Sequence, residues 1–156
     1  MNSDFKDALS ALIDAEVRFL VVGGYAVIHY AEPRFTKDLD LWIEPSATNA
    51  SALAKAFRRF GLPLIEVTEA DFARPGTQFM VGVPPTSIDF ITTCANLDFA
   101  PCWERRVMVD IGGLSVPYLS ESDLILGKEQ LGRDQDLIDV RKLREQKRNT
   151  SDGNLP

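Results

Sequence analysis

Three acidic residues in two short apolar strings have the spacing of a metal site. Asp38 and Asp40 alternate with leucines in Asp-Leu-Asp-Leu-Trp-Ile, and Asp89 stands alone in Ser-Ile-Asp-Phe-Ile. Alternate side chains of a strand share a face, so the first two carboxylates lie on one side, with Cα atoms about 6–7 Å apart. Asp89 joins them if the two strands are neighbours. Such a trio is suited to Mg²⁺ or Mn²⁺, which neutralises triphosphate charge and activates an attacking hydroxyl.

A glycine pair supplies the second half of this chemistry. Gly23 and Gly24 follow an apolar, β-branched string at residues 17–22 and precede a short helix expected at residues 25–30. Glycines at such a turn let backbone N–H groups approach a phosphate closely, and the helix N-terminus adds a dipole that favours anions. Residues 25–37 leave room for that helix and a return loop before Asp38.

The cysteines and the histidine do not offer another metal site. Cys94 and Cys102 have no further cysteine partners, and His29 is the one histidine of the chain. Zinc and other transition-metal sites need more of these ligands, which leaves carboxylates as the metal-binding groups. Nothing in the sequence indicates secretion, so free thiols in a reducing cytosol are expected.

The composition is that of an acidic globular protein. The formal net charge is −6 and the pI is near 4.8, which disfavours a general DNA-coating or membrane-surface protein. No apolar run approaches the ~20 residues of a membrane span. We therefore expect a single cytoplasmic domain at residues 1–148, without a membrane partner, followed by a disordered tail at residues 149–156.

The elements expected around these residues form an α+β fold. Apolar residues at helical spacing predict helices, and short β-branched strings between turn residues predict strands. The helices are expected at residues 3–15, 25–30, 46–60, 120–131 and 134–147, and the strands at residues 17–22, 38–43, 64–67, 77–83, 87–92, 107–111 and 114–119. Residues 94–104 fit neither pattern. This order favours a small mixed β-sheet flanked by helices.

The fuller string around these motifs resembles a known family. It reads Gly-Gly-Tyr-Ala-Val at residues 23–27 and Arg-Phe-Thr-Lys-Asp-Leu-Asp-Leu at residues 34–41, with the Asp89 strand after it. In these residues the chain is similar to the nucleotidyltransferase superfamily with the polymerase-beta-like fold, and to its small bacterial members of the abortive-infection and toxin–antitoxin kind. The C-terminal string from Lys128 to Asp139 also resembles their Lys…Arg…Asp segment.

The resemblance implies a role for each matching residue. Asp38, Asp40 and Asp89 would be the catalytic, metal-binding carboxylates, with Asp89 either completing the metal site or accepting the proton of the acceptor hydroxyl. Arg133 and Asp136 would pair and brace the C-terminal helices. The residues that would bind the nucleoside triphosphate are Gly23, Gly24, Arg34, Thr36 and Lys128.

Two functions of different classes follow from these features. The first is a Mg²⁺- or Mn²⁺-dependent enzyme that transfers a nucleotidyl group from a nucleoside triphosphate to a hydroxyl of a protein, a tRNA or a small molecule, with release of pyrophosphate. The second is a catalytically degenerate module that binds a nucleotide or a cognate partner protein, for instance within a toxin–antitoxin pair. The sequence leaves the base, the acceptor and the oligomeric state open.

Overall fold

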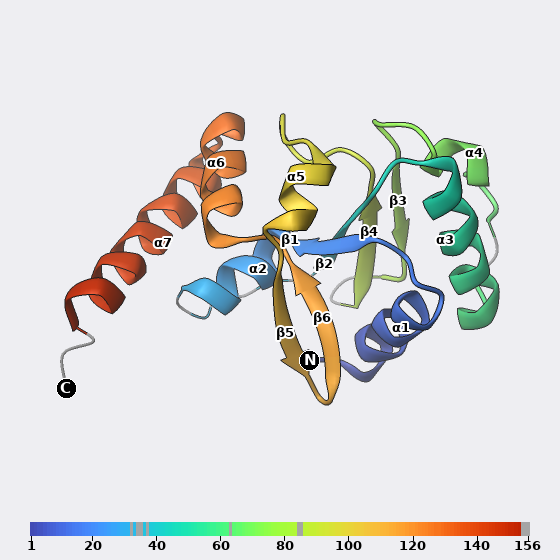
Figure 1. Ribbon diagram of the computed structural model, residues 1–156, viewed down its shortest axis with the longest axis horizontal. Coiled ribbons are helices and arrows are strands. Elements are labelled where there is room, and N and C mark those ends of the chain that lie inside the picture. Colours follow the sequence, from blue (N-terminus) through green and yellow to red (C-terminus); the bar gives the residue numbers. More distant parts are fainter. Residues whose placement is uncertain (32, 34–35, 37, 63, 84–85, 154–156) are drawn as a thin grey trace.

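The computed structural model describes residues 1–31, 33, 36, 38–62, 64–83 and 86–153 (Figure 1). This part of the chain forms six strands and seven helices. The strands are β1 (Phe19–Val22), β2 (Asp38–Ile43), β3 (Gln78–Val81), β4 (Ser87–Ile91), β5 (Val107–Ile111) and β6 (Leu114–Tyr118). The helices are α1 (Ser3–Asp14), α2 (Gly23–Tyr30), α3 (Ala47–Phe60), α4 (Glu69–Phe72), α5 (Phe99–Glu104), α6 (Glu121–Leu131) and α7 (Asp134–Gly153).

The strands form one mixed sheet in the order β3-β4-β2-β1-β6-β5. The pairs β2–β4 and β1–β6 are parallel, and the pairs β1–β2, β3–β4 and β5–β6 are antiparallel. Because β1 runs opposite to β2 and β4, the end of β1 lies at the same edge of the sheet as the starts of β2 and β4. The expected α+β class, with a mixed sheet and flanking helices, is therefore confirmed.

One face of the sheet carries the main apolar core. Leu39 and Leu41 of β2 and Phe90 of β4 are buried on this face, and α1 and α3 pack together on the same side (Figure 1). Phe57 of α3 meets Phe90 edge-on, with ring centroids 4.9 Å apart. Burial of these large side chains fixes which residues of β2 and β4 point inward and which point to the opposite face.

The opposite face is covered along only part of its length. Trp42 shares that face with Asp40, because the two are alternate residues of β2. Phe99 of α5 packs edge-on against Trp42, with ring centroids 5.1 Å apart. Helix α5 therefore covers the C-terminal end of β2. The N-terminal end, which carries the acidic residues, is not covered by α5.

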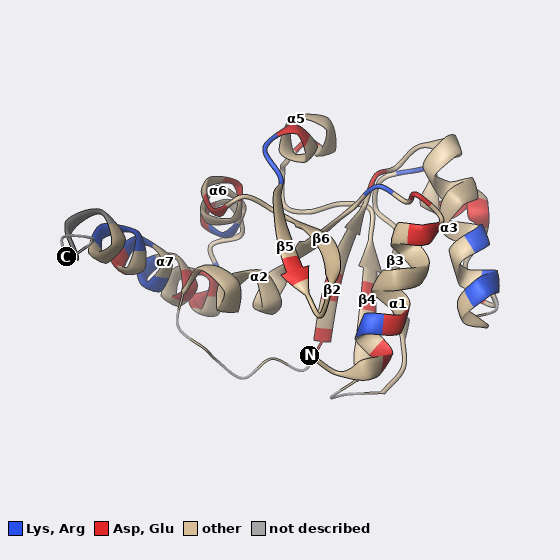
Figure 2. Cartoon of the chain, turned by 60° about the horizontal axis from the view of Figure 1, so that its bottom comes forward, with Lys and Arg blue, Asp and Glu red and all other residues tan. Residues whose placement is uncertain are grey.

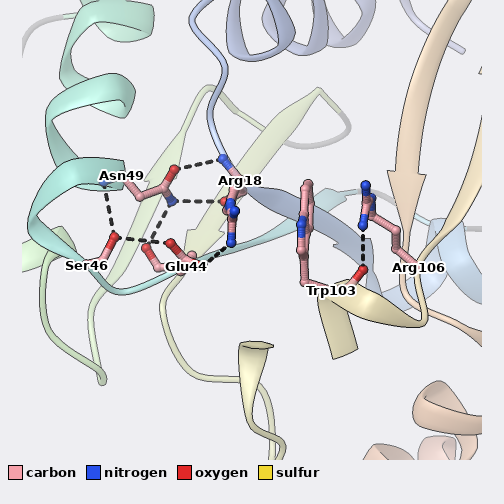
Figure 3. Close-up of polar contacts among 6 residues, drawn as sticks. All are labelled: Arg18, Glu44, Ser46, Asn49, Trp103 and Arg106. Atoms are coloured by element: carbon pink, nitrogen blue, oxygen red, sulfur yellow. Dashed lines mark hydrogen bonds and ion pairs between the residues drawn. The ribbon is translucent and has the colours of Figure 1, made fainter. Parts of the chain in front are cut away.

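A buried asparagine ties α3 to the sheet (Figure 3). Asn49 is 5% exposed, and its Oδ1 accepts a hydrogen bond of 2.7 Å from the backbone N–H of Arg18. Its Nδ2 donates to the backbone oxygens of Arg18 at 2.9 Å and of Glu44 at 3.0 Å. One side chain thereby satisfies three backbone groups at the start of β1 and the end of β2, a role that no local pattern in the sequence predicts.

Several elements differ from the sequence-based expectation. No strand forms at residues 64–67 in the described part of the chain; Ile65 is 80% exposed there, without a neighbouring strand to accept it. The unassigned residues 94–104 contain α5, and α4 begins at a capping box formed by Thr68 and Asp71. Helix α7 passes its expected end and includes residues 149–153 of the expected tail. None of the described helices combines the length and the apolarity needed to traverse a bilayer.

Candidate functional site

The pairing of β2 with β4 brings the three predicted carboxylates onto one face. In the parallel register Asp40 lies opposite Asp89, and Asp38 lies opposite Ser87. Adjacent strands are about 4.8 Å apart, so these side chains are direct neighbours. Figure 2 shows the acidic residues on the two strands. The prediction that Asp89 would join the other two acids if the strands were neighbours is therefore confirmed.

Two of these carboxylates accept hydrogen bonds from neutral side chains. The Ser87 hydroxyl donates to Asp38 Oδ1, and Gln78 Nε2 of β3 donates to Asp89 Oδ2 at 2.8 Å. Burial raises the pKa of Asp89; the Gln78 hydrogen bond lowers it, and the charge of Asp38 raises it again. Asp89 Oδ1 is buried and accepts no hydrogen bond from the described residues.

Gly23 lies directly against Asp40 because it has no side chain. Its φ is +66°, in the left-handed region that favours glycine, and a Cβ there would lie 2.1 Å from Asp40 Oδ2. Gly23 lines the cavity, whereas Gly24 is buried in the first turn of α2 and is not part of the described lining. The two predicted phosphate glycines thus have different environments.

A cavity of about 490 Å³ opens in front of Asp40 and Asp89. Its walls come from the ends of β1 and β6, from β2, β3 and β4, from residues 93–97, from α6 and from the start of α7. Ala95 in this wall has a φ of +48°, an uncommon conformation for a residue with a Cβ. The aliphatic part of the lining includes Ile91, Leu97, Leu119, Leu124 and Leu131.

Lys128 and Arg133 form the cationic side of the cavity. Lys128 is 8% exposed, and its Nζ lies 3.0 Å from Asp139 Oδ2 and 3.4 Å from Asp136 Oδ1. Arg133 Nε lies 2.6 Å from Asp136 Oδ2, so the predicted pairing of Arg133 with Asp136 is confirmed. The Lys128 charge is therefore balanced by two buried carboxylates that join α6 to α7.

Arg133 differs from Lys128 in its exposure. The Arg133 side chain is 72% exposed, although it lines the same cavity. Its hydrogen bond to Asp136 and the charge of that residue raise its pKa, and the charge of Asp40 contributes in the same direction. Arg133 thus faces the acidic side of the cavity with a guanidinium that remains accessible to an anion.

The other residues predicted to bind the nucleoside triphosphate are not part of the described lining. The Thr36 hydroxyl donates to the backbone oxygen of Asp38 at 3.4 Å, which supports the start of β2. Arg34 lies outside the described residues. Cys94 lines the cavity, but burial raises its pKa to about 12, so it stays a neutral thiol and is no nucleophile near pH 7.

The chemistry of the carboxylates fits a hard divalent cation. All three offer oxygen ligands, Asp89 Oδ1 has no hydrogen-bond partner in the described part of the chain, and the charges of Asp38 and Asp89 repel each other. Among the described residues, no group of three or more His, Cys, Asp or Glu side chains is compact enough to enclose an ion. Binding would therefore require the carboxylates to turn farther toward one another.

Sequence reasoning missed two features of this site. Gln78 is an exposed residue of the edge strand β3, and only the β3–β4 pairing brings it to Asp89. Met80 lies opposite Asp89, and Gln78 is on the same face as Met80. Knowledge of the β3–β4 pairing would therefore have predicted the contact between Gln78 and Asp89. Arg133 was expected to have only a bracing role, yet it also lines the cavity.

No protein-family model matches this sequence, and no curated protein matches it.

Proposed function

We propose that the protein is a divalent-metal-dependent nucleotidyltransferase that moves a nucleoside monophosphate group from a nucleoside triphosphate to a hydroxyl acceptor. The observation that carries this proposal is the register of Asp40 with Asp89, directly against Gly23 and at the mouth of a cavity of about 490 Å³. A glycine backbone beside paired carboxylates suits a metal-bound triphosphate, because backbone N–H groups can approach the phosphates and the metal neutralises their charge. We extend the proposal to the polymerase-beta-like fold, which the sheet and the acidic strands support.

Asp38, Asp40 and Asp89 would hold the cation. Of the two roles that the resemblance implies for Asp89, ligation is favoured, because its buried Oδ1 has no partner among the described residues and a cation would relieve its repulsion with Asp38. When bound, Mg²⁺ or Mn²⁺ supplies charge neutralisation at the phosphates and lowers the pKa of the attacking hydroxyl.

The reaction balances with groups that the substrates themselves supply. The acceptor oxygen forms a bond to the α-phosphorus, and the bond from that phosphorus to the bridging oxygen of the β-phosphate breaks. Pyrophosphate leaves with the bonding electron pair, and the hydroxyl proton passes to solvent. The protein contributes mainly by positioning and by charge, as in other phosphoryl-transfer sites.

Arg133 is the better candidate for a phosphate contact than Lys128. The Lys128 side chain is 10% exposed and pairs with two carboxylates, whereas the Arg133 side chain pairs with Asp136 alone and is 72% exposed at the cavity. A guanidinium also offers several donors in one plane to phosphate oxygens. We therefore propose that Lys128 holds α7 against α6, and that Arg133 binds the triphosphate.

The direct test is transfer of label. The purified protein is incubated with Mg²⁺, cell extract and each of the four nucleoside triphosphates labelled at the α-phosphate. We expect label to move to one class of acceptor, and Asp40→Asn to abolish the transfer. The matched control is Asp7→Asn, which removes the same charge from an exposed position of α1. Absence of transfer with all four nucleotides, together with absence of nucleotide binding, would overturn the proposal.

The alternative is a nucleotide-binding or protein-interaction module without catalysis. It is favoured by the lack, within the described residues, of an acidic group already compact enough to hold an ion. Its distinguishing result is nucleotide binding that needs no metal and survives replacement of both Asp38 and Asp40 by alanine. Equilibrium dialysis with and without Mg²⁺ separates the two functions.

A further inference from the structure

Two neutral donors hold one oxygen each of two carboxylates. The Ser87 hydroxyl donates to Asp38 Oδ1, from the position directly opposite on β4. Gln78 Nε2 donates to Asp89 Oδ2 at 2.8 Å from the edge strand β3. The second oxygen of Asp89 is buried and has no partner among the described residues, so the hydrogen bonding of this carboxylate is one-sided.

The type of the donors matters as much as their position. Asp89 is partly buried beside another acid, where an arginine or lysine would be the usual compensation. The partner at position 78 is instead an uncharged amide on an exposed strand. A cationic side chain would occupy the place of a divalent ion, whereas an amide fixes the carboxylate and leaves its negative charge available to an ion.

We propose that Gln78 and Ser87 are positioning residues for a divalent cation, an inference that rests on the proposed function. Each anchors one oxygen of a carboxylate, so that the carboxylate can turn about that oxygen and present its second oxygen to the ion. Partners of this kind outside the ligand set orient ligands and raise metal affinity. Neither residue touches the nucleotide in this scheme.

The test measures metal binding rather than turnover. Mn²⁺ is titrated into the intact protein, and free Mn²⁺ is followed by electron paramagnetic resonance, without nucleotide. The variants are Gln78→Met, which keeps the length of the side chain and removes the donor, and Ser87→Ala. The matched control is Met80→Leu, an exposed apolar change on the same strand and face as Gln78. Thermal unfolding of each variant is measured in parallel.

We expect Gln78→Met and Ser87→Ala each to raise the dissociation constant for Mn²⁺ about tenfold, and Met80→Leu to leave it unchanged. The melting temperature of Gln78→Met should fall by no more than about 2–4 °C, because the side chain is exposed and gives up one hydrogen bond. Wild-type affinity for Mn²⁺ in Gln78→Met would overturn the inference and leave the metal site intact. An equal loss of Mn²⁺ affinity in Met80→Leu would also overturn the inference, because any change in β3 would then weaken metal binding.

Failure of the proposed function gives a different result. If the wild-type protein binds no Mn²⁺, or if Asp40→Asn binds it as tightly as wild type, the carboxylates do not form the metal site. The positioning role of Gln78 is then overturned as well. If metal binds and depends on Gln78 but no nucleotidyl transfer occurs, the positioning role stands and the enzymatic proposal alone is overturned.

Discussion

Replacing Gly23 by alanine should damage the candidate site more than it damages the fold. The new Cβ would lie 2.1 Å from Asp40 Oδ2 and 2.9 Å from Asp40 Cγ, distances at which one of the two side chains must move. Asp40 is the movable partner, because its carboxylate is the end of a side chain and Gly23 belongs to the backbone turn. We therefore expect Asp40 to rotate away from Asp89, which it now faces across the β2–β4 pair.

The expected stability loss follows from the backbone conformation. An alanine at a φ of +66° pays about 1–2 kcal/mol for the left-handed region. For a chain of this size, that corresponds to a decrease in melting temperature of about 2–8 °C. Gly61→Ala is the matched control, since Gly61 has a φ of +83° and no atoms within 4 Å of the added Cβ. It should lose a similar amount of stability.

Mn²⁺ titration separates the two glycines. Gly23→Ala should weaken Mn²⁺ binding about tenfold or more, by displacing a ligand, and Gly61→Ala should not change it. In an Asp40→Ala background the two atoms nearest the new Cβ are gone and the Cβ of residue 40 remains at 3.1 Å, so Gly23→Ala should then cost little more than the backbone strain. Unchanged Mn²⁺ affinity in Gly23→Ala, with stability no lower than in Gly61→Ala, would refute the close contact between Gly23 and Asp40.

Three further predictions concern the elements around the cavity. Burial acts to raise the pKa of Asp123, but hydrogen bonds from Arg105 and Ser120 outweigh it and hold the pKa below its ordinary value. The stability that the ionised carboxylate contributes is present above about pH 4 and is lost as the pH falls further. Asp123→Asn should therefore make the melting temperature fall less steeply at acid pH. Lys128→Met should cost about 3–5 kcal/mol in urea unfolding, because it removes the buried ammonium that pairs with Asp139 at 3.0 Å and leaves Asp136 with Arg133 as its cation. Ala95→Gly should stabilise the fold by up to about 1 kcal/mol in the same assay, by relieving a φ of +48°.

Each of these three predictions has an outcome that would contradict it. An acid limb in Asp123→Asn as steep as in wild type would mean that other groups control acid unfolding. A change below about 1 kcal/mol in Lys128→Met would show that the buried pairs are exchangeable for apolar packing. A loss of stability in Ala95→Gly would mean that the greater freedom of glycine in the unfolded chain outweighs the relief of strain.

The local features of this chain could be predicted from its sequence because they depend on neighbouring residues. Strand alternation placed Asp38 and Asp40 on one face, and the strands expected at residues 107–111 and 114–119 form β5 and β6. Ser46 caps α3 and Gly61 ends it in the left-handed conformation. Each of these depends on a period of two or on a cap at a fixed offset, which a single stretch of sequence contains.

The features that the sequence did not predict depend on residues far apart in the chain. Residues 64–67 carry a strand-like apolar string, yet a strand needs a partner for its hydrogen bonds, and none reaches this segment in the described structure. The pairing of Lys128 with Asp136 and Asp139 depends on how the next helix packs against α6, and the expected phosphate contact of Lys128 stays a prediction. Neither outcome is encoded in the spacing of nearby residues.

The sequence by itself determined which acids could share a strand face and where a glycine turn would precede a helix. Only the tertiary structure decided that β4 lies beside β2 in the register that sets Asp89 against Asp40, and that Gln78 reaches Asp89 from the edge strand. The physical reason is that register follows from burying Leu39, Leu41 and Phe90 against α1 and α3, a packing condition that involves distant segments at once.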